Sequence, residues 1–320
     1  MTAAVIVDTA GGLMGGAARF RTELQSYLIR SGREDVRVIG SKHRLDSTWL
    51  MRRELIGPAR HRRVSLNNVG FFTPGGERWT LLRNALHFLT KEEESRLDPS
   101  LRGGNSRRAA TVRLAARCSD VLIAPSTAMA ERVAKVIPSV CGRIVVRPHP
   151  VSADPMPRPP REPVILCPVL FESYKPMVER LTELLTAMDD IDPSVRVHVT
   201  AGYSEVPTTL TINPRIRLVG RLDYADLCNL SARSSATYFP THLESFGYPL
   251  AEARASGHPV IALDTAQNRE IAGPALCGFN LGDVASLRRA TVLALTQQVA
   301  PDPTPFDPDS YFAWLLGSPR

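Results

Sequence analysis

The chain alternates short, branched apolar runs with amphipathic helical stretches, and this alternation occurs in two blocks. Strands in a parallel sheet that helices cover on both faces are buried on both sides, so they are continuously apolar. The pattern therefore predicts α/β domains built on doubly wound parallel sheets. The expected strands of the first block are residues 3–9, 36–40, 121–125 and 143–148, and those of the second are 163–169, 195–202, 216–220, 236–240 and 259–263.

A proline-rich stretch separates the two blocks. The segment "PHPVSADPMPRPPREP" (148–163) contains seven prolines, which exclude a helix interior or a central strand and indicate a stiff linker. A chain of 320 residues also exceeds the size at which one core stops growing. We therefore expect two Rossmann-like domains facing a cleft, over residues 1–150 and 151–300. Residues 301–320, a proline-rich spacer and a short amphipathic stretch, are expected to pack back on the N-terminal domain.

The net charge of +7 is divided unevenly between the two halves. Residues 1–150 carry 25 Lys and Arg against 13 Asp and Glu, whereas residues 151–320 carry 14 against 19. The basic half would suit a phosphorylated acceptor, an acidic membrane surface or nucleic acid, and solvated helix faces are the simpler explanation. Aromatic residues that could stack on bases are not interleaved with these arginines, so nucleic acid is the weakest of these readings.

Cysteine usage and the N-terminus favour a reducing compartment. The five cysteines are odd in number, widely spaced and without a CxxC pair, which argues against a disulfide framework and a zinc site. The segment "MTAAVIVDTAGG" has no basic region before its apolar run and is interpreted as a first buried strand. No apolar run approaches the roughly 18 residues of a membrane span. The expected location is the cytoplasm.

The segment "HLESFGYPLAEARASGHPVIA" (242–262) places Glu244 in a Gly/Pro turn and Glu252 inside the helix that follows. A helix that begins near Gly247 directs its free backbone N–H groups at a ready anion site. Glu252, about one turn further on, could then accept hydrogen bonds from two ribose hydroxyls, and Glu244 could meet the group beyond the phosphates. The alternative is that Glu252 only favours a helix N-terminus and Glu244 is solvated.

The longer segment "PTHLESFGYPLAEARASGHPVIALDTAQNREIAG" resembles the donor-site signature of the retaining glycosyltransferases of family 4, often called glycosyltransferase group 1. That family has the GT-B fold, with two Rossmann domains. The resemblance implies that Glu252 binds the ribose of a nucleotide-diphosphate sugar. It implies further that Glu244 lies by the transferred sugar and the reacting centre, so Glu244 is a candidate catalytic residue. It also implies that the segment Ser245, Phe246 and Gly247 contributes to donor binding through its backbone amides.

The resemblance implies a further role for Lys175, in "FESYKPMVERLTELL", where it would neutralise the leaving diphosphate. A solvated lysine at a helix start is the alternative. The family usually pairs that lysine with an arginine five residues earlier, where this chain has Leu170. Arg221 or Arg269 could supply the missing charge.

In the first block, the loop "GGLMGG" resembles the family's glycine loop, and Gly15 and Gly16 match it best. It is not a GxGxxG fingerprint, so a nicotinamide enzyme is not expected. Residues 65–90 are apolar but carry Asn84 and His87. The family often has polar residues in this region, including a histidine, which makes His87 a candidate catalytic residue and Asn84 a candidate on the acceptor side. A histidine that is merely part of the core is the alternative.

No cofactor and no metal are expected, because the resemblance implies that Lys175 and the helix N-terminus replace a metal ion. The pairs "DID" (190–192) and "DPD" (307–309) are explained by turn chemistry. The expected function is a retaining, metal-independent glycosyltransferase that acts on an acceptor hydroxyl. Anionic molecules, small natural products, glycolipids and polysaccharides stay open as acceptors, as does peripheral contact with a membrane. A GT-B phosphorylase or epimerase and a non-catalytic donor-binding subunit are the alternative functions.

Overall fold

The computed structural model describes residues 5–12, 15–56, 62–95, 99–152, 160–169, 171 and 176–317. The chain divides into two compact units, each of which has its own six-stranded parallel sheet. The first unit comprises Met1–Ser152, Leu243–Phe246 and Pro305–Arg320, and the second comprises Ala153–His242 and Gly247–Thr304. The expected α/β class with two Rossmann-like parts is confirmed. Of the proline-rich linker, residues 153–159 lie outside the described part of the chain.

The sheet of the first unit has the strand order β2-β1-β3-β4-β5-β6. The strands expected near residues 3–9, 36–40, 121–125 and 143–148 are all present as members of this sheet. Their bounds are β1 (Val5–Asp8), β2 (Val36–Ile39), β3 (Arg62–Ser65), β4 (Arg78–Leu81), β5 (Val121–Ala124) and β6 (Ile144–Val146). The order changes direction between β1 and β3, and ligands of doubly wound sheets bind at the carboxyl ends of such strands.

Strands β3, β4 and β12 (Leu276–Phe279) were not predicted; β3 has two adjacent arginines, Arg62 and Arg63, and a single apolar residue. Their guanidinium groups lie on aromatic rings: Arg62 is 4.3 Å from the ring centre of Trp79, and Arg63 is 5.2 Å from that of Phe71. Arg63 also donates to the carbonyl oxygen of Thr73 at 2.5 Å. Cation–π contacts and hydrogen bonds therefore allow charged residues to start buried strands.

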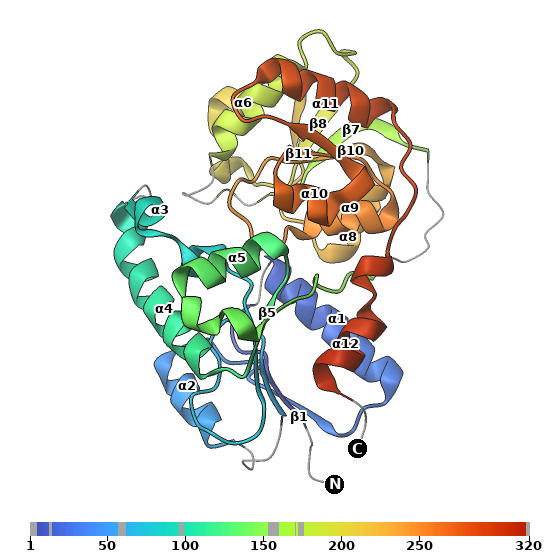
Figure 1. The fold of residues 1–320 in the computed structure, drawn as a ribbon. Coiled ribbons are helices and arrows are strands. Elements are labelled where there is room, and N and C mark those ends of the chain that lie inside the picture. The colour runs from blue at the N-terminus through green and yellow to red at the C-terminus, as the bar shows by residue number, and fades with distance from the viewer. Residues whose placement is uncertain are drawn as a thin grey trace. The chain divides into compact units, whose positions relative to one another are not determined.

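Helices cover both faces of this sheet (Figure 1). The helix α1 (Gly15–Ser31) lies beside α12 (Pro308–Leu316), where Phe20 packs edge-on against Phe312 at 5.5 Å. The helices α4 (Pro99–Cys118) and α5 (Thr127–Val136) lie on the opposite face. The remaining helical elements are α2 (Ser47–Glu54), α3 (Lys91–Ser95) and the 3₁₀ helices η1 (Ala85–Phe88) and η2 (Pro138–Arg143).

The sheet of the second unit has the order β12-β11-β10-β7-β8-β9. Its strands are β7 (Glu162–Cys167), β8 (Arg196–Val199), β9 (Ile216–Leu218), β10 (Ser234–Phe239), β11 (Val260–Leu263) and β12 (Leu276–Phe279). The chain moves outward from β7 through β8 to β9 and then returns to place β10 on the other side of β7. This is the strand order of Rossmann domains, with the change of direction between β7 and β10.

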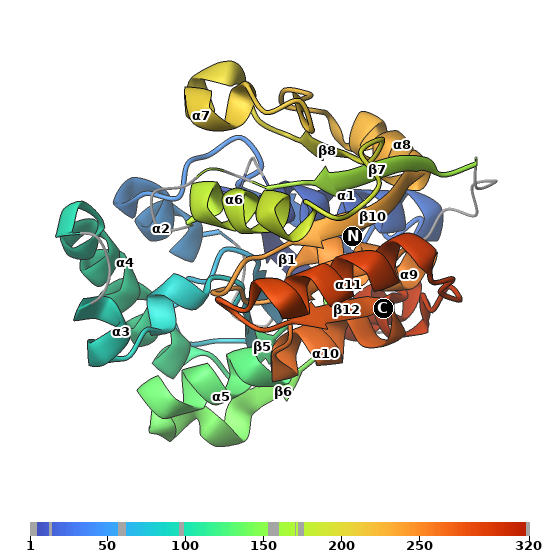
Figure 2. The ribbon, with the colours of Figure 1, turned by 90° about the horizontal axis from the view of Figure 1, so that it is seen from above.

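Two groups of helices sandwich this second sheet (Figure 1). The helices α6 (Met177–Ala187) and α11 (Val284–Thr296) lie side by side on one face, as the view from above also shows (Figure 2). The helices α8 (Tyr224–Arg233), α9 (Tyr248–Ser256) and α10 (Ala266–Ala272) cover the other face. The shorter elements are α7 (Thr208–Thr211) and the 3₁₀ helices η3 (Tyr203–Glu205), η4 (Gly273–Ala275) and η5 (Thr304–Phe306).

Candidate functional site

The segment that carries the two glutamates, a loop with Glu244 and then α9 with Glu252, follows β10, one of the two strands at the change of direction in the second sheet. β10 pairs directly with β7, with Thr237 opposite Leu166. Residues 240–247 therefore leave the sheet at the carboxyl end of β10, beside the carboxyl end of β7. In Rossmann sheets, this place is where nucleotides bind.

A left-handed glycine begins the helix after this loop. Gly247 is the N-cap of α9 with φ of 83°, and a Cβ there would lie 2.9 Å from Leu250 Cδ1. Only glycine adopts this conformation without strain. The helix ends at a second left-handed glycine, Gly257, which confirms the predicted stop. Glu252 lies half-buried within α9, one turn from its start. In the first turn, Pro249 has no N–H and the Leu250 amide donates to the Gly247 carbonyl oxygen at 3.0 Å. The uncapped N-terminus of α9 and the Glu252 carboxylate thus belong to one helix of the second unit.

The residues just before Gly247 pack instead with the first unit. Ser245 is buried, its hydroxyl donates to the carbonyl oxygen of Arg83 at 2.7 Å, and its own carbonyl accepts from the Ser126 hydroxyl at 2.9 Å. Phe246 is 2% exposed, with its ring 4.9 Å from that of His149. The side chains of Ser245 and Phe246 therefore hold this segment to the first unit. The family resemblance assigns the backbone amides of the segment to donor binding.

Glu244 belongs to this anchored segment. It is half-buried and directly precedes Ser245, whose two hydrogen bonds fix the backbone at that point. The structure therefore assigns Glu244 to the first unit and Glu252 to the second. The roles of both residues in a reaction stay predictions.

Of the cations expected near a diphosphate, the structure describes Arg221 and Arg269. Lys175 and Leu170 lie outside the described residues. Arg221 forms an ion pair with Glu205, and Arg269 forms one with Asp264 at 2.6 Å. The pKa of Arg269 is raised by its hydrogen bond to Asp264. Each of the two arginines proposed as a substitute thus has a carboxylate partner.

The glycine loop of the first unit is a run of left-handed backbone after β1. Gly11, Gly12 and Gly15 have φ of 70°, 66° and 59°. A Cβ on Gly12 would lie 2.6 Å from the Cβ of Ala17 and 2.9 Å from Nη2 of Arg83. Gly16 lies in the first turn of α1. The loop therefore requires glycine at Gly12 for space as well as for backbone conformation, and its described part exposes backbone where a substrate could approach.

His87 and Asn84 lie together on η1, which follows β4. The Asn84 side chain accepts a hydrogen bond from the Leu86 amide at 3.0 Å and so caps η1. Burial, with help from the positive charges of Arg108 and Arg113, lowers the pKa of His87 to about 4. His87 is therefore a neutral imidazole at physiological pH. Such a group could accept a proton or donate a hydrogen bond, and nothing in the structure tests its catalytic role.

A buried polar network that was not predicted supports the glycine loop. Asp8, fully buried at the end of β1, accepts from Arg53 Nη1 at 2.6 Å, Asn67 Nδ2 at 2.8 Å, Trp49 Nε1 at 3.1 Å and the Ala10 amide at 3.0 Å. A charge with several hydrogen-bonding partners can be buried, and the network fixes where β1 ends. The one available signal in the sequence was a lone aspartate at the end of a buried apolar strand.

The acidic pairs have structural roles. Asp190 forms an ion pair with Arg288, and Asp192 accepts from the Ser194 amide at 2.8 Å. Asp307 caps α12, and Asp309 contacts Arg30 at 2.7 Å. Among the residues that the structure describes, no group of three His, Cys, Asp or Glu side chains could hold a metal ion. No helix in the described part of the chain is long and apolar enough to span a bilayer.

Residues 177–286, 110 of the 320, match the family model described as glycosyl transferases group 1. This range contains Glu244, Glu252 and all of the strands β8 to β12. No protein of curated function matches the chain in sequence.

Many solved structures share the fold. WaaG, a glycosyltransferase involved in lipopolysaccharide biosynthesis, has a TM-score of 0.65 and 14% identity over 98% of this chain and 94% of its own. Sucrose-phosphate synthase from Thermosynechococcus elongatus has a TM-score of 0.63 and 15% identity over 98% and 93%. Anabaena HepE, solved in complex with UDP and glucose, has a TM-score of 0.61 and 14% identity over 98% and 95%. The expected resemblance is confirmed: the chain has the GT-B fold of these glycosyltransferases, and its residues 177–286 match the group 1 glycosyltransferase family.

Proposed function

We propose that the protein is a retaining, metal-independent glycosyltransferase that moves a sugar from a nucleotide-diphosphate sugar to an acceptor hydroxyl. The second unit binds the nucleotide and the first unit binds the acceptor. No cofactor takes part besides the donor substrate.

The position of α9 carries this proposal. Its N-terminus lies at the carboxyl end of β10, beside β7, and no side chain caps it, so the positive end of its dipole is available to an anion. A diphosphate at this helix end would place the ribose one turn further along the helix, at Glu252. The match to the group 1 family model covers the same residues.

The chemistry required of the chain is electrostatic. The bond between the anomeric carbon and the diphosphate oxygen breaks, a bond to the acceptor oxygen forms on the same face, and the acceptor proton passes to the departing diphosphate. Negative charge grows on the diphosphate oxygen, so donors aimed at that oxygen lower the barrier. The N-terminus of α9, through its dipole, and the predicted contact from Lys175 supply positive charge there, and a metal ion is then not needed.

Nucleotide binding tests the donor site directly. We expect one of UDP, GDP, ADP and dTDP to raise the Tm of the purified protein in the presence of EDTA, because a ligand that binds only the folded state stabilises it. Glu252→Ala should abolish that shift without changing the Tm of the free protein by more than a few degrees. Glu131→Ala, an exposed glutamate on α5 of the first unit, is the matched control and should retain the shift. Unchanged nucleotide affinity in Glu252→Ala would refute the donor site.

Turnover separates the alternatives. A phosphorylase or an epimerase would convert its sugar substrate without a separate acceptor hydroxyl. A donor-binding subunit without activity would bind the nucleotide sugar and transfer nothing to any acceptor. The leucine at position 170 is the feature that favours this last alternative, since the family usually has an arginine there.

A further inference from the structure

The helix α2 divides its side chains between the core of the first unit and the solvent. Trp49 and Arg53, one turn apart, are both buried. Met51 and Leu55, also one turn apart, are 68% and 86% exposed. The C-cap Leu55 keeps a right-handed helical backbone with φ of −88° and ψ of −6°, so its side chain neighbours that of Met51. One face of α2 therefore presents two large apolar side chains to the solvent.

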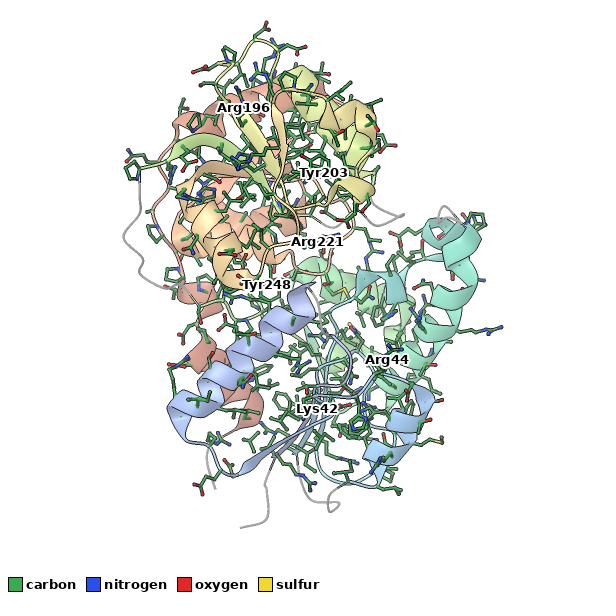
Figure 3. The ribbon with its side chains drawn as sticks, turned by 180° about the vertical axis from the view of Figure 1, so that it is seen from behind. Lys42, Arg44, Arg196, Tyr203, Arg221 and Tyr248 are labelled. Atoms are coloured by element: carbon green, nitrogen blue, oxygen red, sulfur yellow. The ribbon has the colours of Figure 1, made fainter. Side chains whose placement is uncertain are left out.

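Three cations accompany this apolar pair. Arg52 lies on α2 between Met51 and Leu55, and Lys42 and Arg44 lie in the segment that leads into the helix (Figure 3). All three cationic side chains are exposed, and among the described residues none of them has an ion-pair or hydrogen-bond partner. We call Met51, Arg52 and Leu55, together with Lys42 and Arg44, the α2 surface.

The segment before α2 is held to the helix by three contacts. The Asp46 amide donates to the Arg44 carbonyl oxygen at 3.1 Å, and the Asp46 side chain caps α2 by accepting from the Trp49 amide at 2.8 Å. The His43 ring stacks on the Trp49 ring, with 4.2 Å between their centres. Lys42 and Arg44 therefore have a defined place beside the N-terminus of α2.

The other charged side chains of this stretch are occupied within the fold. Arg53 pairs with the buried Asp8 at 2.6 Å. Glu54 accepts from two backbone amides of the loop after β3, at 3.1 and 3.0 Å. Asp46 is the one exposed carboxylate of residues 41–56, against three exposed cations. The exposed charge of the α2 surface is therefore positive.

We propose that the α2 surface docks the protein on an anionic lipid bilayer. Met51 and Leu55 enter the boundary between headgroups and acyl chains, and the three cations lie at the lipid phosphates. Apolar side chains on an exposed helix face with cations beside them are typical of a helix that lies in the membrane interface, and positive charge selects an anionic leaflet. A bilayer extends along the whole of α2, which is about 12 Å long, so the cations need not converge on one point.

The apolar pair favours a bilayer over a nucleic acid. Phosphates of a nucleic acid would compensate the cations but would leave Met51 and Leu55 in water. The one aromatic ring of α2, that of Trp49, is buried under His43, so it is not available for stacking on bases. Docking on a bilayer uses the first unit alone and does not depend on the proposed donor site.

Co-sedimentation of the full-length protein with vesicles tests the electrostatic part. We expect binding to phosphatidylcholine vesicles that contain phosphatidylglycerol, weaker binding to phosphatidylcholine alone, and weaker binding as salt is added. Arg52→Gln should weaken binding to the anionic vesicles about fivefold, the effect of one cation near an anionic surface. Arg289→Gln, an exposed arginine on α11 of the second unit, changes the net charge equally and should bind as the unchanged protein does.

Insertion of the apolar pair is measured separately. Met51→Ser/Leu55→Ser should weaken binding about tenfold or more without lowering the Tm, because both side chains are exposed in the free protein. Val292→Ser/Leu293→Ser, an exposed apolar pair on α11, is the matched control. The fluorescence of Met51→Trp should shift to shorter wavelength on anionic vesicles, because the added ring leaves water.

Four results would overturn the proposal. They are equal binding to both kinds of vesicle, equal binding by the unchanged protein and Arg44→Gln/Arg52→Gln, and an unshifted Met51→Trp spectrum on anionic vesicles. The fourth is binding to polyglutamate as tightly as to anionic vesicles, which would assign the surface to an acidic protein. Glu252→Ala should bind vesicles as the unchanged protein does, so a failure of the nucleotide site and a failure of the α2 surface give different results.

Discussion

Phe246 offers the sharpest test of how the donor signature is built into the fold. Its ring is 2% exposed and lies 4.9 Å from the ring of His149 and 6.1 Å from that of Phe306. Truncation of a buried phenylalanine to alanine removes its transfer free energy and leaves a cavity, which together cost about 3–5 kcal/mol. We therefore expect Phe246→Ala to destabilise the first unit by about that amount.

Hydrogen exchange can measure this locally, because each unit has its own core. Peptides that contain residues 144–152 and 305–316 should exchange more than about 100-fold faster in Phe246→Ala, since each 1.4 kcal/mol is a factor of ten. Peptides over β11 in the second unit should change little. Phe246→Leu, which keeps most of the volume, should cost less than about 1.5 kcal/mol. Unchanged exchange at residues 144–152 in Phe246→Ala would show that this segment is not part of the first core.

Two further predictions concern backbone conformation and pH. Gly247→Ala forces a left-handed alanine whose Cβ meets Leu250 Cδ1 at 2.9 Å, so we expect about 2–4 kcal/mol of destabilisation in urea unfolding and loss of the nucleotide-induced Tm shift. Gly202→Ala, with φ of −83° and its nearest atom at 3.6 Å, is the control and should change neither; equal effects would contradict the argument. The pKa of His87 is lowered to about 4, so between about pH 6.5 and 4 the unfolded state binds more protons and stability falls as the pH falls. His87→Gln should remove up to about 3 kcal/mol of that decline, and parallel loss of stability in both proteins would refute a His87 that stays neutral in the folded state.

The strand pattern predicted most of the fold because it depends on local composition. Continuous apolar runs such as those of β1, β5, β7 and β11 have one physical explanation, burial on both faces of a parallel sheet. The strands β3 and β4 escaped detection because they hold few apolar residues, Val64 in β3 and Trp79 and Leu81 in β4. Their arginines are accommodated by Trp79 and by Asp120, which pairs with Arg78 at 2.9 Å. Those partners are distant in sequence, so no local pattern reveals them.

The candidate site was predictable to the extent that its residues share one helix. The capping glycines Gly247 and Gly257 and the carboxylate of Glu252 are all read from the helix and its ends. The Asp8–Arg53 ion pair could not be predicted, because 45 residues separate its two members along the chain. The same limit applies to Arg83, whose contact with Gly12 exists only once β1 and β4 are in one sheet.

The donor signature is continuous in sequence but divided in the structure. The chain passes from the first unit to the second at the bond between Phe246 and Gly247. Phe246, before this bond, is buried in the first unit. Gly247, after this bond, has the left-handed backbone that begins α9 in the second unit. Because Glu244 precedes the division and Glu252 follows it, their spacing of seven residues does not by itself place them on one rigid element. The stability of the first unit therefore governs where Glu244 is held, whereas the nucleotide site proposed at α9 belongs to the second.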